Sequence, residues 1–186
     1  MSWIATVPPA EAEGTLKTVY EAIACTRGGV ADIHRAQSLN VAALKAHLEL
    51  YKAIVFQRSS LRRIDRERIA VVVSSANTCR YCVAHHAEAL RNLHDDSAVV
   101  DLLSTGDIPD SLPAPARLLL AWAKRGALQP AQASETDIRE LRSAGWDDRA
   151  VTDAALTVAY FSFVNRLVLL LGVELEDDFA RTCREA

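Results

Sequence analysis

Apolar residues recur every three or four positions along almost the whole chain, which is the spacing of amphipathic α-helices. No strand pattern competes with it, because the β-prone triplet Val71–Val73 has flanks that favour helix. We therefore expect an all-α fold. The pattern predicts helices over 8–27, 31–38, 41–58, 66–76, 79–93, 99–103, 115–125, 135–144 and 151–171.

Residues that cap or end helices separate these segments. The N-cap candidates are Asn40, Asp65, Thr78, Asp95 or Asp96, and Asp147 or Asp148, and Ser134–Asp137 resembles a capping box with Asp in place of Glu. The stretch 107–115 is rich in proline and suggests a boundary between two helical lobes near 106–114. We treat residues 1–186 as a single domain whose core motif lies at 61–93.

The segment 151–171 is apolar on nearly every side of its predicted helix. A helix of this kind is buried in the middle of a bundle or in a subunit interface. Gly172 ends it, and we expect the acidic segment 174–178 beyond to be a solvated end.

Composition narrows the class of protein. Half of the 186 residues are hydrophobic, enough for one core or two small helical lobes without disulfides. The net charge of −3 and the lack of a basic block argue against a nucleic-acid partner. The first residues do not resemble a signal peptide, and the longest apolar run, 167–171, is too short to span a bilayer. We expect a cytoplasmic protein with no membrane partner, where a Cys-x-x-Cys pair is more often catalytic, redox-active or metal-binding than structural.

One short stretch, 67–86, concentrates the residues that carry chemistry. It holds Glu67, the pair Cys79-x-x-Cys82 and His86. At about 100° per residue, a helix through both cysteines places their sulfurs and the His86 ring on one face. If the helix that precedes Cys79 packs antiparallel to the helix that contains both cysteines, Glu67 lies level with His86 along the helix axes. The hypothesis is a carboxylate–imidazole–thiol chain, which orients a base and activates a sulfur nucleophile.

Other roles for these residues compete with that hypothesis. Cys79 and Cys82 can be two buried helix cysteines, or they can bind zinc together with His85 or His86. A structural zinc site usually draws on two separated ligand pairs and no second pair is present, so we expect no metal. His85 and Tyr81 point further round the helix and are secondary candidates. We expect Cys25 and Cys183 to be inert helix residues, and His34, His47 and His94 to lie on the surface.

Glu67, Cys79-x-x-Cys82 and His86, in this order and spacing, resemble the core of the alkylhydroperoxidase D-like proteins of the carboxymuconolactone decarboxylase superfamily. The segment Tyr160–Arg166, followed by Gly172-Val-Glu-Leu, is similar to a later helix of their peroxidase-related subgroup. The resemblance implies an alkylhydroperoxidase D-like helical bundle and an obligate homo-oligomer, commonly a trimer or hexamer.

The resemblance also implies a thiol-dependent peroxidase. Cys82 would attack a hydroperoxide, Cys79 would resolve the product to a disulfide, and Glu67 and His86 would relay protons. An external dithiol reductant protein would reduce the disulfide, and no bound cofactor would be needed. The best-studied members have a histidine where this chain has Tyr81, whose ordinary pKa of about 10 does not suit proton transfer at neutral pH. We therefore expect weak turnover or a different oxidant.

Three points stay open at this stage. The first cysteine of a helix-opening Cys-x-x-Cys should have the lower pKa, which favours Cys79 as nucleophile, whereas the family role favours Cys82. The alternative function is that of a non-peroxidase member, either a decarboxylase-like lyase or a redox-sensing oligomer. Asn165 and Arg166 lie on an apolar helix and need partners, for which we favour a structural role over lining a pocket.

Overall fold

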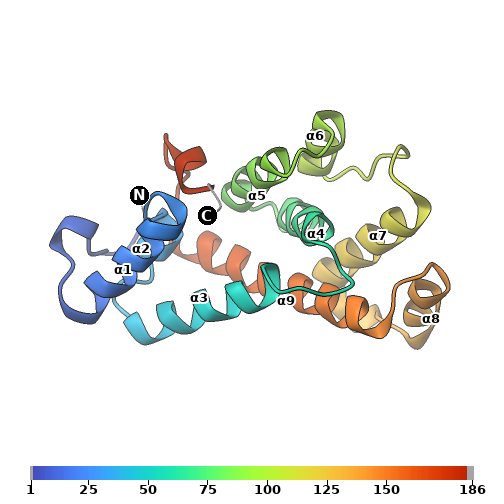
Figure 1. Ribbon diagram of the computed structural model, residues 1–186, viewed down its shortest axis with the longest axis horizontal. Helices are drawn as coiled ribbons and strands as arrows, with labels where there is room; N and C mark the ends of the chain where they lie inside the picture. The colour runs from blue at the N-terminus through green and yellow to red at the C-terminus, as the bar shows by residue number, and fades with distance from the viewer. Residues whose placement is uncertain (1, 184–186) are drawn as a thin grey trace.

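The computed structural model describes residues 2–183, and this range contains helices and no strand (Figure 1). The predicted all-α fold is confirmed. The α-helices are α1 (Gly14–Arg27), α2 (Asp32–Arg35), α3 (Val41–Val55), α4 (Arg63–Ala76), α5 (Arg80–Asn92), α6 (Ser97–Thr105), α7 (Ala114–Leu128), α8 (Glu135–Ser143) and α9 (Asp148–Leu171). Three 3-10 helices accompany them: η1 (Pro9–Glu11), η2 (Pro130–Gln132) and η3 (Phe179–Cys183).

Helix α4 lies at the centre of the molecule. It packs against α5, α6, α7 and α9, and its residues Ile69–Val73 are completely buried (Figure 1). Burying this apolar run is favourable because it removes hydrocarbon surface from water. The β-branched residues of the run are therefore held in a helix by tertiary packing.

The main hydrophobic core joins residues from Ala31 to Val173. A smaller core between α1 and α3 contains Leu16, Tyr20, Ile23 and Leu44. The predicted lobe boundary near 106–114 is wrong, because the main core includes residues on both sides of that loop and α7 packs directly on α4.

Helix α9 runs through the bundle and contacts α3, α4, α7 and α8 (Figure 1). Within residues 2–183 it is also the one helix long and apolar enough to cross a membrane by length and composition. However, 44% of its most apolar window is buried inside the protein, including Ala154, Phe161 and Val168. Packing in the middle of the bundle, one of the two predicted roles, accounts for this buried part of α9, whereas Phe163 and Leu170 are among its residues that stay exposed.

Most of the predicted caps are present, and three predicted helix starts are wrong. The side chains of Asn40, Asp96, Asp147 and the Ser134–Asp137 capping box all accept backbone N–H groups. The prolines near residue 8 form η1, and α1 begins at Gly14.

The other two wrong starts flank the central helices. Asp65 lies inside the first turn of α4, where an acid is favourable, and its carboxylate pairs with Arg62 at 2.8 Å. Thr78 has a left-handed backbone (φ 55°), which leaves Cys79 as the N-cap residue of α5.

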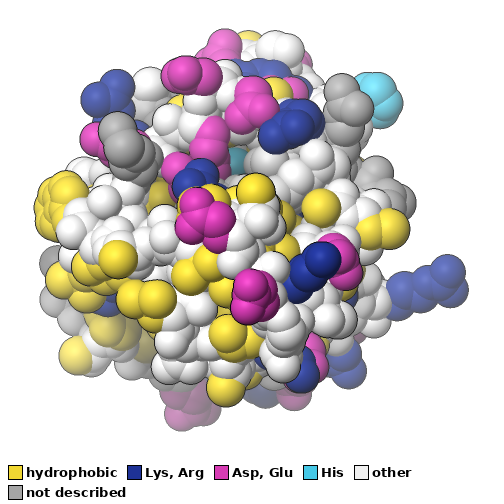
Figure 2. Space-filling model, turned by 90° about the vertical axis from the view of Figure 1, so that its left-hand side faces the viewer, with side chains coloured by type: hydrophobic (Ala, Val, Ile, Leu, Met, Phe, Trp, Pro, Cys, Tyr) yellow, Lys and Arg dark blue, Asp and Glu magenta, His cyan; other side chains and the backbone are white. Residues whose placement is uncertain are grey.

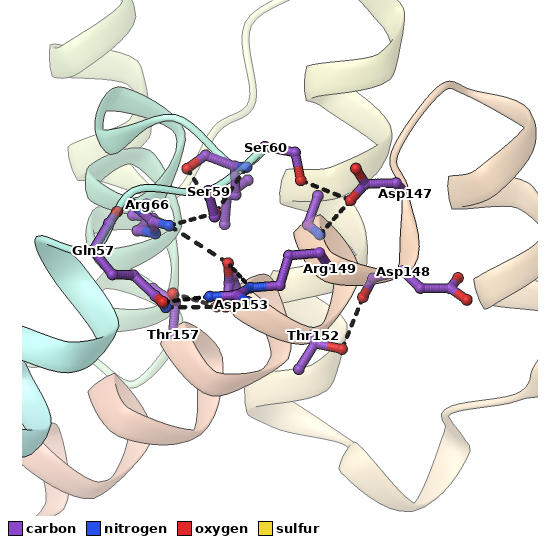
Figure 3. Close-up of polar contacts among 12 residues, drawn as sticks. Gln57, Ser59, Ser60, Arg66, Asp147, Asp148, Arg149, Thr152, Asp153 and Thr157 are labelled. Carbon is purple, nitrogen blue, oxygen red and sulfur yellow. Dashed lines mark hydrogen bonds and ion pairs between the residues drawn. The ribbon is translucent and has the colours of Figure 1, made fainter.

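A buried polar network fastens the α3–α4 loop and α4 to α9 (Figure 3). Arg66 is 1% exposed and donates to the Gln57 carbonyl oxygen at 2.9 Å and to Ser59 Oγ at 2.7 Å. Its guanidinium also lies 3.5 Å from the carboxylate of Asp153, which accepts from Gln57 and Arg149. A buried charge is tolerated when it is paired and hydrogen-bonded in this way. The network holds α4, and with it Glu67, in a fixed position against α9.

Candidate active site

Glu67 and His86 meet because α4 and α5 pack together across the short turn at 77–79. Glu67 Oε2 lies 2.6 Å from His86 Nδ1, so the contact predicted from the sequence is present. Glu67 is completely buried, and its Oε1 accepts two hydrogen bonds from Arg63, at 2.6 and 2.9 Å. Burial alone would raise the Glu67 pKa, but His86 and Arg63 outweigh it and the pKa is lowered. Glu67 is therefore ionised at neutral pH.

The charge on Glu67 sets the tautomer of His86. An ionised carboxylate accepts hydrogen bonds and cannot donate them, so Nδ1 of a neutral His86 carries the proton. The other nitrogen, Nε2, is then free to accept a proton. The His86 ring is further held edge-on against Phe161, with 4.5 Å between ring centroids. This arrangement is that of an oriented general base.

The two thiols of Cys79 and Cys82 are free, buried and hydrogen-bonded to each other. The pKa of Cys79 is lowered, first by the hydrogen bond from the Cys82 thiol and then by backbone N–H groups of Cys82 and Tyr81. The pKa of Cys82 is raised by its hydrogen bond to Cys79 and by burial. Of the two thiols, Cys79 at the positive end of α5 therefore has the lower pKa, as the helix-dipole argument predicts.

Asn165 of α9 is a member of this site that sequence reasoning assigned to a structural role. Its side chain is completely buried, and its interaction with both thiols lowers the pKa of each. Asn165 Nδ2 also donates to Ser74 Oγ at 3.0 Å, and its Oδ1 accepts from Asn77 Nδ2 at 3.0 Å. In the sequence, this role was indicated only by the position of Asn165 as a lone amide on an otherwise apolar helix. Arg166, by contrast, is exposed and donates to a carbonyl of its own helix, so it needs no buried partner.

A cavity of about 60 Å³ opens beside Cys82 and His86. Tyr51, Tyr160 and Phe161 are among its other walls, whereas Cys79 does not line it. A small molecule that enters the cavity therefore meets the Cys82 sulfur first.

The prediction that His34 and His47 lie on the surface is wrong. They are 3% and 6% exposed, respectively, and both line this cavity. His47 is held between Tyr160 Oη, 2.6 Å from Nε2, and Gln37 Oε1, 3.0 Å from Nδ1. Burial lowers the pKa of His47 to about 4, so its ring is neutral at neutral pH. The His47 ring is held inside the protein by Tyr160, which lies 113 positions further along the chain, and helical periodicity does not reveal so distant a partner.

The acidic segment at 174–178 is not wholly solvated as predicted. Glu176 is partly buried against α5, where Tyr81 Oη donates to its Oε1 at 2.9 Å and His85 Nε2 lies 3.2 Å from its Oε2. Burial raises the Tyr81 pKa well above its usual range. Tyr81 therefore acts as a hydrogen-bond donor that anchors the C-terminal segment.

Residues 2–183 contain no group of three or more His, Cys, Asp or Glu side chains arranged to hold a metal ion. The zinc alternative weighed from the sequence therefore has no support in the described part of the chain.

With this geometry in place, the chain can be compared with known proteins. Residues 42–125, from α3 into α7, match the model of the Carboxymuconolactone decarboxylase family. A crystal structure of a peroxidase-related protein from Silicibacter sp. TM1040 superposes with a TM-score of 0.83 at 28% identity, covering 96% of this chain and 94% of that one. These two matches confirm the resemblance to the carboxymuconolactone decarboxylase/alkylhydroperoxidase D-like superfamily that the motifs indicated.

Two further solved structures show the same fold. The alkylhydroperoxidase AhpD core of a peroxidase-related protein from Ralstonia eutropha JMP134 has a TM-score of 0.88 at 23% identity, covering 98% of this chain and 96% of that one. The debrominase Bmp8, solved as a cysteine-to-alanine variant with 2,3,4-tribromopyrrole, has a TM-score of 0.78 at 20% identity, covering 98% and 97%. No curated protein is significantly similar to this chain.

Proposed function

We propose that this protein is a thiol-dependent peroxidase that reduces a hydroperoxide through a dithiol–disulfide cycle of Cys82 and Cys79. The observation that carries the proposal is the Glu67–His86 pair, 2.6 Å apart, beside a cavity that Cys82 lines. His86 is four residues after Cys82 on α5, so the two side chains are neighbours on one helix face. The superfamily resemblance and the similar peroxidase-related protein support the same function.

The reaction begins when a hydroperoxide enters the cavity. His86 Nε2 accepts the Cys82 thiol proton, while Glu67 stabilises the imidazolium. The Cys82 sulfur attacks one peroxide oxygen, the O–O bond breaks, and the leaving oxygen takes the proton back from His86 as an alcohol or water. Cys82 is now a sulfenic acid. General acid–base catalysis of this kind typically contributes on the order of 100-fold or more.

Resolution uses Cys79, the thiol with the lower pKa. Cys79 gives up its proton, its sulfur attacks the Cys82 sulfur, the S–O bond breaks, and the hydroxyl leaves with that proton as water. Asn165, which interacts with both sulfurs, keeps them together during this step. An external dithiol reductant then returns the disulfide to two thiols by exchange. The cycle needs no bound cofactor or metal.

Tyr81 replaces the histidine of the best-studied family members, and we propose that it takes no part in proton transfer. Its hydroxyl is committed to Glu176, and its pKa is raised by burial. The proton relay therefore consists of Glu67 and His86 alone, which fits slower turnover.

The test is peroxide consumption by wild type, Cys82→Ser and Cys79→Ser, with a panel of dithiol reductants. Wild type should consume peroxide continuously, Cys82→Ser should not consume it, and Cys79→Ser should turn over more slowly than wild type and form a sulfenic acid on Cys82 that dimedone, present during the oxidation, traps. Cys25→Ser is the control, because Cys25 is exposed on α1 and outside the cavity. A sulfenic acid trapped only on Cys79, in Cys82→Ser, would reverse the assigned roles.

The alternative, a lyase or a redox-sensing member of the superfamily, makes a different prediction. A lyase should keep an unchanged thiol titre after excess peroxide. A redox sensor should lose two thiols per chain, reversibly with dithiothreitol, but should not turn over with any reductant. The peroxidase alone combines thiol loss with sustained peroxide consumption.

A further inference from the structure

A second acid–imidazole–thiol chain faces the cavity from the C-terminal segment. Glu176 Oε2 lies 3.2 Å from His85 Nε2, and His85 Nδ1 lies 3.4 Å from Cys183 Sγ. Glu176 is itself held by the Tyr81 hydroxyl and by the backbone N–H of Asp32. The order of groups repeats that of Glu67, His86 and Cys82, although Cys183 was expected to be inert.

The protonation states of this chain are consistent with one another. Hydrogen bonds from His85 and from the Asp32 N–H outweigh burial and lower the Glu176 pKa to about 2, so its carboxylate is ionised. Burial lowers the pKa of His85 and raises that of Cys183 to about 12, so both are neutral at rest. His85 Nε2–H then donates to Glu176, and Nδ1 accepts from the Cys183 thiol. Cys183 therefore rests beside a base that is oriented to take its proton.

Cys82 and Cys183 line the same cavity of about 60 Å³, whereas Cys79 lies behind it. His85 is three residues after Cys82 on α5, so a contact to His85 brings Cys183 to the next turn of that helix. Helix η3, which contains Cys183, packs directly on α5. An oxidised Cys82 and Cys183 therefore face the same cavity.

The cavity also contains a polar atom without a protein partner. His34 Nδ1 is buried and makes no hydrogen bond within the described residues, and the His34 side chain lines the same cavity. Leaving a buried polar atom without a hydrogen-bond partner is unfavourable. A peroxide or sulfenic acid oxygen in the cavity would satisfy it, which marks the Cys183 side of the cavity as part of a ligand site.

We propose that Cys183 is a second resolving thiol, which condenses with the Cys82 sulfenic acid to form a Cys82–Cys183 disulfide. The inference rests on the proposed peroxidase function. His85 takes the Cys183 thiol proton, the Cys183 sulfur attacks the Cys82 sulfur, the S–O bond breaks, and the hydroxyl leaves as water with the proton from His85. The product fastens η3 to α5, and the same external dithiol reduces it by exchange.

The test is a tryptic map of Cys79→Ser after one equivalent of peroxide, with and without dimedone. Cleavage after Arg80 and Arg181 puts residue 79, Cys82 and Cys183 on three different peptides. The expected result is a Cys82–Cys183 linked peptide that dithiothreitol cleaves and that dimedone or Cys183→Ser abolishes. Wild type should contain the same peptide as a minor species, because Cys79 competes, and this arm does not depend on how the variant folds.

Three outcomes decide the matter. A trapped Cys82 sulfenic acid with no link to Cys183, in both Cys79→Ser and wild type, would overturn the inference and leave the peroxidase function standing. No sulfenic acid in any variant would overturn both. In the Cys79→Ser background, His85→Gln should lower the rate of linking relative to the rate of Cys82 oxidation at least tenfold; an unchanged ratio of the two rates would show that the role of His85 is wrong. Cys25→Ser is the matched thiol control.

Discussion

Individual residues at this site depend on a few short contacts between buried groups. Glu67 keeps its charge in the core because Arg63 and His86 occupy its two oxygens. The same carboxylate without those partners would take up a proton to avoid the cost of a buried charge. The role of Glu67 therefore follows from its neighbours as much as from its own chemistry.

We expect Glu67→Gln to reduce the rate of Cys82 oxidation by peroxide on the order of 100-fold, because a neutral amide does not stabilise the His86 imidazolium. Stopped-flow mixing with dimedone quenching measures this rate. Glu88→Gln on α5 is the control, since Glu88 pairs only loosely, at 3.8 Å, with Arg91. Equal rates for both variants would remove Glu67 from the relay.

His47 predicts how stability depends on pH. Its pKa is about 4 in the folded protein against 6.5 for an ordinary histidine, so the unfolded chain binds the proton first as the pH falls. The stability that neutral His47 contributes is therefore complete above pH 6.5 and is lost between 6.5 and about 4. At 1.36 kcal/mol per pKa unit this is about 3 kcal/mol.

Urea unfolding at several pH values measures this slope for wild type and His47→Gln. The variant should lose less stability than wild type between pH 6.5 and 4. The exposed His94 provides the control, and His94→Gln should follow the wild-type curve. Parallel curves for wild type and His47→Gln would show that His47 is protonated equally in both states.

At the scale of elements, the α4–α9 contact decides whether the site is assembled. Helix α4 carries Glu67, α5 carries the thiols, and α9 supplies Asn165 and Phe161. The network of Arg66 and Asp153 joins two of these three helices (Figure 3). It has no contact with the cavity walls and contributes by holding the helices in register.

We expect Arg66→Ala to destabilise the fold by about 3–5 kcal/mol, because it leaves the Asp153 carboxylate buried with fewer partners. Replacing both, as Arg66→Met with Asp153→Leu, should recover part of the loss. Chemical denaturation gives both values. Arg142→Ala is the matched control: its pair with Asp148 is on the surface, so little change should follow. A small effect of Arg66→Ala would show that water replaces the network.

At the scale of the whole molecule, several large apolar side chains lie on the surface, among them Trp3, Leu39, Leu156, Phe163 and Leu170. Figure 2 shows hydrophobic side chains gathered on one part of the face that it presents. Apolar side chains gathered on a surface are typical of protein–protein contacts. This surface supports the homo-oligomer expected from the family resemblance, which we keep as a proposal.

We expect light scattering of the purified protein to give a multiple of the 20.3 kDa chain mass that corresponds to a trimer or hexamer. Leu170 is 75% exposed at the end of α9, and Leu170→Glu should shift the protein towards smaller species without unfolding it. Glu174→Ala is the control, because it changes a nearby residue without placing a charge on the exposed apolar surface. A wild-type mass of 20.3 kDa would rule out the oligomer.

The sequence by itself determined the helices and the local half of the site. Periodic apolar positions report which side of each helix is buried, and Glu67 and His86 are only 19 positions apart on two adjoining helices, so helical geometry alone predicted their contact. The cap at Asn40 and the stops at Gly28 and Gly172 are equally local, since each acts on its own turn of backbone.

Only the tertiary structure decided what lies opposite these residues. Glu176 reaches Tyr81 and His85 from 95 and 91 positions away, and His47 reaches Tyr160 across 113. Periodicity shows that a helix has a buried face but not which distant segment covers it, because that choice depends on the packing of the whole chain. For this reason the sequence assigned Cys183 and His47 to solvent-exposed or inert positions, and the fold placed both around the cavity that Cys82 lines.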